Sequence, residues 1–167
     1  MSWYRAVAAV GALVFVAACG FEPLYGQKSG SSVVADLAAT KVDLIEDRIG
    51  QQLRNTLVEE IAPGGAPQSP RFFLEVKLQE NKSTLAIRLD ETTSRAVLEL
   101  QAKFTLRRIN DGQVLYDGLS RASTSYNVVN SDFATVSAEA DARRRAIRVL
   151  GDDIKLRLAS YFNQSRN

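Results

Sequence analysis

The sequence predicts an α+β fold, a two-layer sandwich in which a sheet of about four strands, mostly antiparallel or mixed, is covered on one face by two helices. Three observations predict it: an amphipathic helix pattern early in the chain, a long stretch of alternating apolar and polar residues in the middle, and a longer helix pattern at the end. The order strand, helix, three strands, helix leaves the second face of the sheet polar and open.

The first predicted elements are a short strand over 41–45 and a helix over 47–61. Within this helix the apolar residues recur every four positions and share one face; they are Ile49, Leu53, Leu57 and Ile61. About 15 residues make a helix that is only marginally stable alone in water, so this apolar face must pack on the sheet. Residues 62–70 are rich in proline and glycine and predict a loop.

The middle of the chain has the period of two that is typical of strands with one covered face. The pattern begins at 72 and alternates to 79, then resumes from 95 to 109. Asn110-Asp111-Gly112 predicts a tight turn into a further strand over 114–126, and a change of apolar parity predicts a bulge near Gly118. Between 79 and 95, the apolar alternation over 85–89 fits either an extension of the sheet or a ligand-binding edge.

A long C-terminal helix is predicted from Asn130-Ser131-Asp132, which supplies a cap and an acidic first turn. Gly151 lies inside this helix and predicts either a kink or close packing against a neighbour. We expect the tail, 163–167, to fray. The apolar stripe of the helix consists of Phe133, Val136, Ala140, Ile147, Leu150, Ile154, Leu158 and Tyr161.

The amino terminus predicts a lipoprotein-type signal peptide over 1–18, in which Arg5 is the only charge. The uncharged segment after Arg5 is shorter than the roughly 20 apolar residues that span a bilayer. Val16-Ala17-Ala18-Cys19-Gly20 resembles the bacterial lipobox, in which the cysteine is acylated and becomes the new amino terminus. The alternative is an ordinary buried cysteine after an Ala-Ala cleavage site. By analogy with lipoprotein sorting, Gly20 in place of aspartate favours the outer membrane.

The predicted organisation after the signal peptide is a lipidated Cys19 with a tether over 19–32, one domain over 33–162 and a flexible tail over 163–167. About 150 residues bury enough surface to fold without disulfides or metal.

Composition excludes several kinds of chemistry. The chain has no histidine and one cysteine, which excludes histidine-based triads, histidine zinc sites and an internal disulfide. The adjacent carboxylates Glu59-Glu60 and Asp152-Asp153 point in different directions on helices, and Glu75 and Glu99 fit ordinary cross-strand ion pairs. We therefore expect no catalytic residues, no metal, no cofactor and no enzymatic activity. A net charge of +2 gives no reason to expect nucleic acid as a partner.

Two basic clusters are candidates for anion binding. Arg143, Arg144, Arg145 and Arg148 form the denser one. Helical spacing pairs Asp141 with Arg145, Asp152 with Lys155 and Asp153 with Arg157, which favours an exposed, ion-paired helix over ligand binding. The second set is spread over the sheet beside apolar residues, where a phosphate and an acyl chain would fit together, although plain sheet extension fits as well. It consists of Lys77, Arg88, Arg95 and Lys103.

The segment Cys19-Gly20-Phe21-Glu22-Pro23-Leu24-Tyr25-Gly26 resembles the start of mature lipoproteins of the LptE family, which act in lipopolysaccharide assembly. The helix over 47–57, the strand pattern and the entry to the last helix, from Tyr126-Asn127 to Phe133-Ala134, are similar to that family too. The resemblance covers essentially the whole mature chain, and the family fold of two helices on a four-stranded sheet coincides with the predicted one.

The resemblance implies a non-enzymatic lipoprotein, anchored by its lipid in the periplasmic leaflet of the outer membrane, that plugs the β-barrel protein LptD. It further implies binding of lipopolysaccharide, with Arg88 as the main cationic contact and Arg95, Lys77 and Lys103 as weaker ones. The arginine cluster at 143–148 matches no family motif and stays outside this ligand site. The alternative is a generic envelope lipid-binding or structural lipoprotein without a barrel partner.

Overall fold

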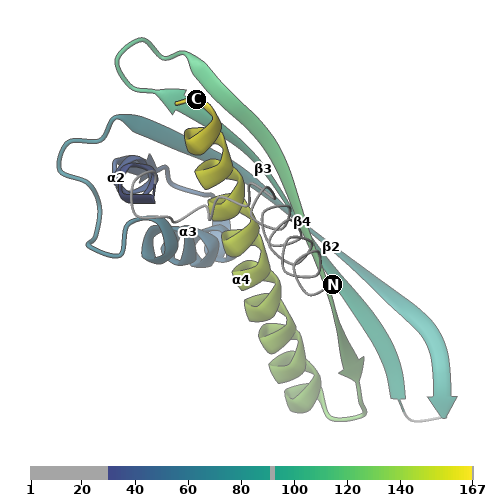
Figure 1. Ribbon diagram of the computed structural model, residues 1–167. Coiled ribbons are helices and arrows are strands. Elements are labelled where there is room, and N and C mark those ends of the chain that lie inside the picture. The colour runs from purple at the N-terminus through teal and green to yellow at the C-terminus, as the bar shows by residue number, and fades with distance from the viewer. Residues whose placement is uncertain (1–29, 91–92, 167) are drawn as a thin grey trace, which may run out of the picture.

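A computed structural model of the chain describes residues 30–90 and 93–166 (Figure 1). The predicted signal peptide, the lipobox and Cys19 lie outside these residues. The described elements, in chain order, are α2 (Gly30–Ala38), β1 (Thr40–Val42), α3 (Asp47–Ile61), β2 (Phe72–Asp90), β3 (Thr93–Arg108), β4 (Val114–Val128) and α4 (Asp132–Gln164). The predicted α+β class is confirmed.

The sheet has the strand order β1-β2-β3-β4, with β1 parallel to β2 and the other neighbours antiparallel. β1 pairs only with the first residues of β2, from Thr40 opposite Phe72 to Val42 opposite Leu74. The three long strands continue far beyond β1 as a twisted ribbon, with α4 alongside it (Figure 1). We call the end with α2, α3 and the β3–β4 turn proximal, and the end with the β2–β3 turn and the start of α4 distal.

The apolar core lies at the proximal end, between the sheet and the helices. α3 has the predicted bounds, and Leu53, Leu57 and Ile61 of its apolar face are buried. Leu150, Ile154 and Leu158 of α4 belong to the same core. α4 begins as predicted at Asp132, because the Ser131 hydroxyl accepts a hydrogen bond from the Ala134 N–H at 3.4 Å and caps the first turn.

Three sequence predictions need correction. Residues 30–38 form a helix, α2, so the last three residues of the tether predicted over 19–32 belong to a helix. Val33 and Leu37, one turn apart, bury its inner face. The strand predicted over 41–45 is β1, which ends at Val42. The last helix continues to Gln164, past the predicted start of the tail.

The bulge predicted near Gly118 is present in β4, three residues before that glycine. The register shifts between Leu106 and Arg107, which pair with Tyr116 and Val114, so the extra residue is Leu115. Gly118 instead lies opposite Phe104, where an added Cβ would come within 2.3 Å of the Phe104 ring. The glycine is needed because the aromatic ring occupies the space that a side chain would take.

Gly151 has the second of its two predicted roles, close packing. A Cβ there would lie 2.9 Å from the Thr56 methyl group of α3, so the missing side chain lets α4 approach α3. The predicted sheet extension between 79 and 95 is present, since β2 continues to Asp90.

Candidate ligand-binding surface

The open face of the sheet, opposite the helices, carries the polar residues of the strands. Strand alternation places Leu74, Val76 and Phe104 towards the helices, and the residues between them on the open face. Across β2, β3 and β4, neighbouring rows of this face are Glu75–Thr105–Asp117, Lys77–Lys103–Leu119 and Gln79–Gln101–Arg121.

Lys77 and Lys103, two of the predicted ligand contacts, are brought together on this face. They are direct cross-strand partners and both are exposed. Neither forms an ion pair with a carboxylate of the described residues, whereas Glu75 in the next row pairs with Arg107 at 3.3 Å. Like charges directly opposite on a sheet repel each other, so the pair favours an anion beside it. Leu119, in the same row, is 38% exposed and adds an apolar neighbour.

Arg95 lies apart from the lysine pair. It is exposed near the distal end of β3, opposite Leu85 and Asn127. It is eight positions along β3 from Lys103, about 27 Å at the usual rise of 3.4 Å per residue. Arg88 belongs to the distal part of β2, but its side chain lies outside the described ones. The four predicted cations therefore do not form one cluster.

A second charged cluster, which the sequence analysis missed, lies on the helix side of the distal sheet. Arg143 of α4 donates hydrogen bonds from Nε and Nη2 to the Glu80 carboxylate, at 2.9 and 3.0 Å, and from Nη2 to Glu139 at 2.6 Å. Lys82 donates to Glu139 at 2.5 Å, and the Tyr126 hydroxyl donates to the same carboxylate at 3.1 Å. We call these five residues the distal network.

Electrostatics in the distal network favour the charged forms of its acids and bases. Hydrogen bonds from Lys82, Arg143 and Tyr126 lower the pKa of Glu139 to about 2, and the hydrogen bond from Arg143 lowers the pKa of Glu80. The pKa values of Lys82 and Arg143 are raised by the same hydrogen bonds, and burial raises the pKa of Tyr126. With two acids and two bases, the network is neutral overall.

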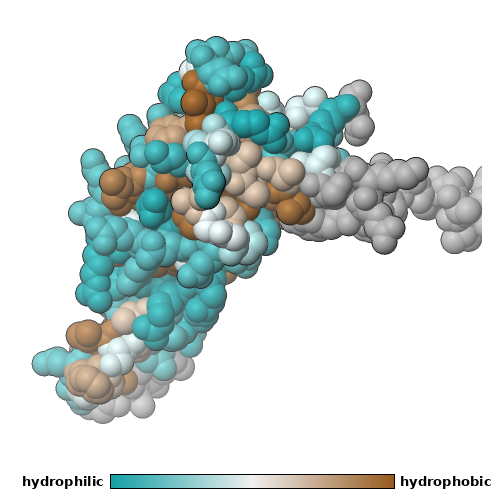
Figure 2. Space-filling view, turned by 90° about the vertical axis from the view of Figure 1, so that its left-hand side faces the viewer, coloured by the Kyte–Doolittle hydropathy of each residue, from teal (hydrophilic) through white to brown (hydrophobic). Residues whose placement is uncertain are grey.

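Strand parity was the available signal for the distal network. Leu74, Val76 and Leu78 point towards the helices, so Glu80 and Lys82 continue the same side of β2. At the start of α4, by contrast, the sequence pattern was misleading. Phe133 and Val136 belong to the predicted apolar stripe, yet their side chains are 83% and 66% exposed. In Figure 2 hydrophobic atoms interrupt the hydrophilic surface near the distal tip.

The arginine cluster of α4 is largely ion-paired, as the helical spacing predicts. Arg144 and Arg145 both contact Asp141, and Arg157 pairs with Asp153 at 2.8 Å. Lys155 contacts Glu60 of α3 at 3.0 Å, a partner that the helical spacing did not predict. Arg143 points into the distal network instead.

Other kinds of site are not evident in the described part of the chain. Within residues 30–90 and 93–166, no three acidic, cysteine or histidine side chains gather where they could hold a metal ion. None of the helices in these ranges has the length and apolar character needed to cross a membrane.

The domain, with one helix-covered face and one open polar face, shares its α+β fold with proteins of known structure. The domain is similar to a protein of Caulobacter crescentus CB15 assigned as a lipoprotein, with a TM-score of 0.64, 19% identity, and coverage of 79% of this chain and 96% of that one. A minor lipoprotein of Acinetobacter baumannii gives a TM-score of 0.54 at 16% identity, covering 72% of this chain and 91% of that one.

The chain belongs to the LptE family of lipopolysaccharide-assembly proteins, whose sequence profile matches residues 34–158. This is a family of non-enzymatic outer-membrane lipoproteins. Among curated proteins, no sequence matches this chain.

Proposed function

We propose that this protein is acylated at Cys19, is anchored on the periplasmic face of the outer membrane, and plugs and helps to assemble the β-barrel LptD. The observation that carries the proposal is the family match over residues 34–158. The open face of the sheet supports it, because a plug in the lumen of a membrane barrel meets polar surfaces. Glutamine, lysine and threonine side chains along β2 and β3 supply such a surface.

We further propose that the open face binds lipopolysaccharide during its transport and insertion. The ammonium groups of Lys77 and Lys103, which pair with no carboxylate of the described residues, match a phosphate, and exposed Leu119 beside them offers an apolar contact. Arg95 and Arg88 would contact a different part of the same large ligand, since both belong to the distal end of the sheet. The ligand would then extend along the ribbon.

Copurification tests the partnership. The tagged, lipidated chain is extracted from outer membranes in mild detergent, and the proteins that remain bound after a stringent wash are identified. A β-barrel of the LptD type in stoichiometric amount is expected, together with loss of surface lipopolysaccharide when the chain is depleted. A lone chain carrying lipid, with normal surface lipopolysaccharide after depletion, would favour a generic lipid-binding lipoprotein.

The ligand surface is tested by charge removal. Lys77→Gln with Lys103→Gln should weaken lipopolysaccharide binding, and Arg88→Asp should do so separately, while the fold is retained. The matched control is Arg144→Gln with Arg148→Gln, which removes two positive charges from exposed positions of α4 on the other layer. Equal losses from both double variants would indicate a general charge effect and reject the surface.

A further inference from the structure

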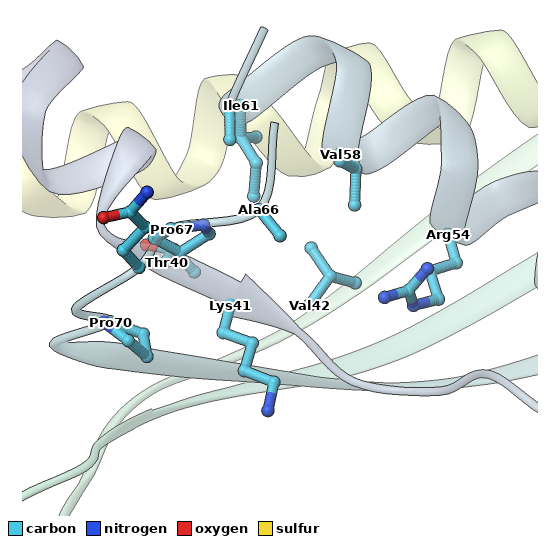
Figure 3. Close-up of a pocket in the computed structure, with 11 residues that line it drawn as sticks. Thr40, Lys41, Val42, Arg54, Val58, Ile61, Ala66, Pro67 and Pro70 are labelled. Carbon is cyan, nitrogen blue, oxygen red and sulfur yellow. The ribbon is translucent and has the colours of Figure 1, made fainter. Parts of the chain in front are cut away.

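A separate pocket lies between α3, β1 and the loop that follows α3 (Figure 3). Its volume is about 240 Å³, and most of its walls are apolar, with Val42 below and Val58 and Ile61 above. Thr40, Gln68 and Arg54 are among its polar lining residues. The pocket is on the helix side of the sheet, so it is distinct from the lysine pair of the open face.

Arg54 is the cation directed into this pocket. Figure 3 shows its guanidinium group extending from α3 towards Val42, whereas the Lys41 side chain points away from α3. The Nε atom of Arg54 is buried and has no hydrogen-bond partner among residues 30–90 and 93–166. In the described part of the chain, no aspartate or glutamate lines the pocket. A buried cationic donor is therefore left without an acceptor from the described residues.

The other arginines show how unusual this is. Eight of those with described side chains form ion pairs with carboxylates: Arg71, Arg107, Arg108, Arg143, Arg144, Arg145, Arg157 and Arg166. Arg48, Arg95, Arg121 and Arg148 are exposed to water. Among the described side chains, Arg54 is the arginine that is both partly buried and outside any ion pair. A buried donor without an acceptor lowers the free energy of unfolding, and a charged one lowers it more.

The chemistry of the pocket defines what would satisfy this donor. A guanidinium presents two parallel N–H donors that match a carboxylate in bidentate geometry. The apolar walls formed by Val42, Val58 and Ile61 suit a short aliphatic stem next to that carboxylate. The volume is below the roughly 300–1,000 Å³ of pockets that take drug-sized ligands, so the group that enters must be small.

We propose that this pocket binds a carboxylate on a short aliphatic stem, held by Arg54. A free short-chain carboxylic acid and the side chain of a glutamate from another protein both carry this group. The proposal does not depend on the function proposed above, because it uses neither the open face nor the barrel partner.

The test is a titration of the mature chain, carrying Cys19→Ser so that it is not acylated, with butyrate at constant ionic strength. Binding is followed by the NMR shifts of the Val42 and Val58 methyl groups and the Arg54 side chain. Butyramide, which has the same shape without the charge, is the ligand control. N-acetylglutamate methylamide presents the carboxylate on a peptide unit and separates the two sources.

Butyrate should shift the Val42 and Val58 signals saturably, and Arg54→Gln should weaken its binding about tenfold or more, as loss of a charge-assisted hydrogen bond predicts. Arg48→Gln, an exposed position of the same helix, should leave binding unchanged. Arg54→Lys keeps the positive charge but lacks the paired N–H donors of the guanidinium, so it should bind butyrate with intermediate affinity. This variant keeps the test informative if Arg54→Gln fails to fold. No saturable shift with either carboxylate, or equal shifts with butyramide, would overturn the proposal.

Discussion

The two halves of α4 are held to the sheet by different interactions. In its second half, Leu150, Ile154 and Leu158 are completely buried and join the core shared with α3. In its first half, Glu139 and Arg143 meet Glu80, Lys82 and Tyr126 through hydrogen bonds and ion pairs. One continuous helix therefore combines a proximal contact that excludes water with a distal contact that retains charge.

This difference teaches where the stability of the domain resides. Burial of apolar area is the main favourable term in folding, whereas a partly exposed ion pair contributes little because water competes for its charges. The side chains of Lys82 and Glu139 are 45% and 24% exposed. We expect the proximal half to determine global unfolding and the distal half to open locally at lower cost.

The largest expected effect is a truncation in the proximal core. Leu150→Ala should lower the free energy of unfolding by about 2–5 kcal/mol, because it leaves a cavity among fully buried side chains. Val136→Ala, in the first half of the same helix and 66% exposed, should change it by less than about 0.5 kcal/mol. Urea denaturation of both variants measures the difference. Similar losses from the two changes would contradict the division of the helix.

A smaller loss is expected from Gly118→Ala in β4. The new methyl group would meet the Phe104 ring, 2.3 Å from its Cζ atom, and overpacking of this kind costs roughly 1–3 kcal/mol. In a Phe104→Leu background the same glycine change should cost less, since the smaller side chain yields space. Strict additivity of the two changes in urea denaturation would show that the ring is not the obstacle.

These cases also show which features of the fold and of the candidate ligand surface could be predicted from the sequence. The bounds of α3 and the sheet could be predicted, because a period of four and a period of two reflect burial directly. The role of Gly118 could not, since it depends on a ring 14 residues away in sequence that packs over it across the strands. The sequence predicted that Lys77 and Lys103 both belong to the sheet. Only the strand register shows that they are direct cross-strand partners.

The distal network illustrates the same limit. Glu80 and Lys82 continue the helix-facing parity of β2, yet their partners Glu139 and Arg143 are about 60 residues away and meet them only through the path of α4. The apolar stripe failed at Phe133 and Val136 for a related reason: periodicity predicts a face, but not how far along a helix the covering sheet extends.

Breaking the distal network should have a local effect of intermediate size. Arg143→Gln leaves Glu80 and Glu139 without their shared cation and should lower the opening free energy of residues 132–146 by about 1–2 kcal/mol. Hydrogen exchange resolved by segment measures it, and residues 147–164 should remain protected to nearly the wild-type level. Arg144→Gln, an exposed neighbour paired with Asp141, is the matched control. Uniform loss of protection along α4 would mean that the halves unfold together.

The smallest effect is the pH dependence of the distal half. The pKa of Glu139 is about 2 in the folded protein, against an ordinary value of 4.5, so its contribution to stability is complete above about pH 4.5 and is lost as the pH falls from there through 2. The lowered pKa of Glu80 acts in the same direction. Exchange of residues 132–146 should therefore accelerate in the wild type, relative to Glu139→Gln, as the pH is lowered through this range. Comparing the two proteins at each pH cancels the intrinsic pH dependence of exchange, and a constant ratio would show that Glu139 does not hold the helix to the sheet.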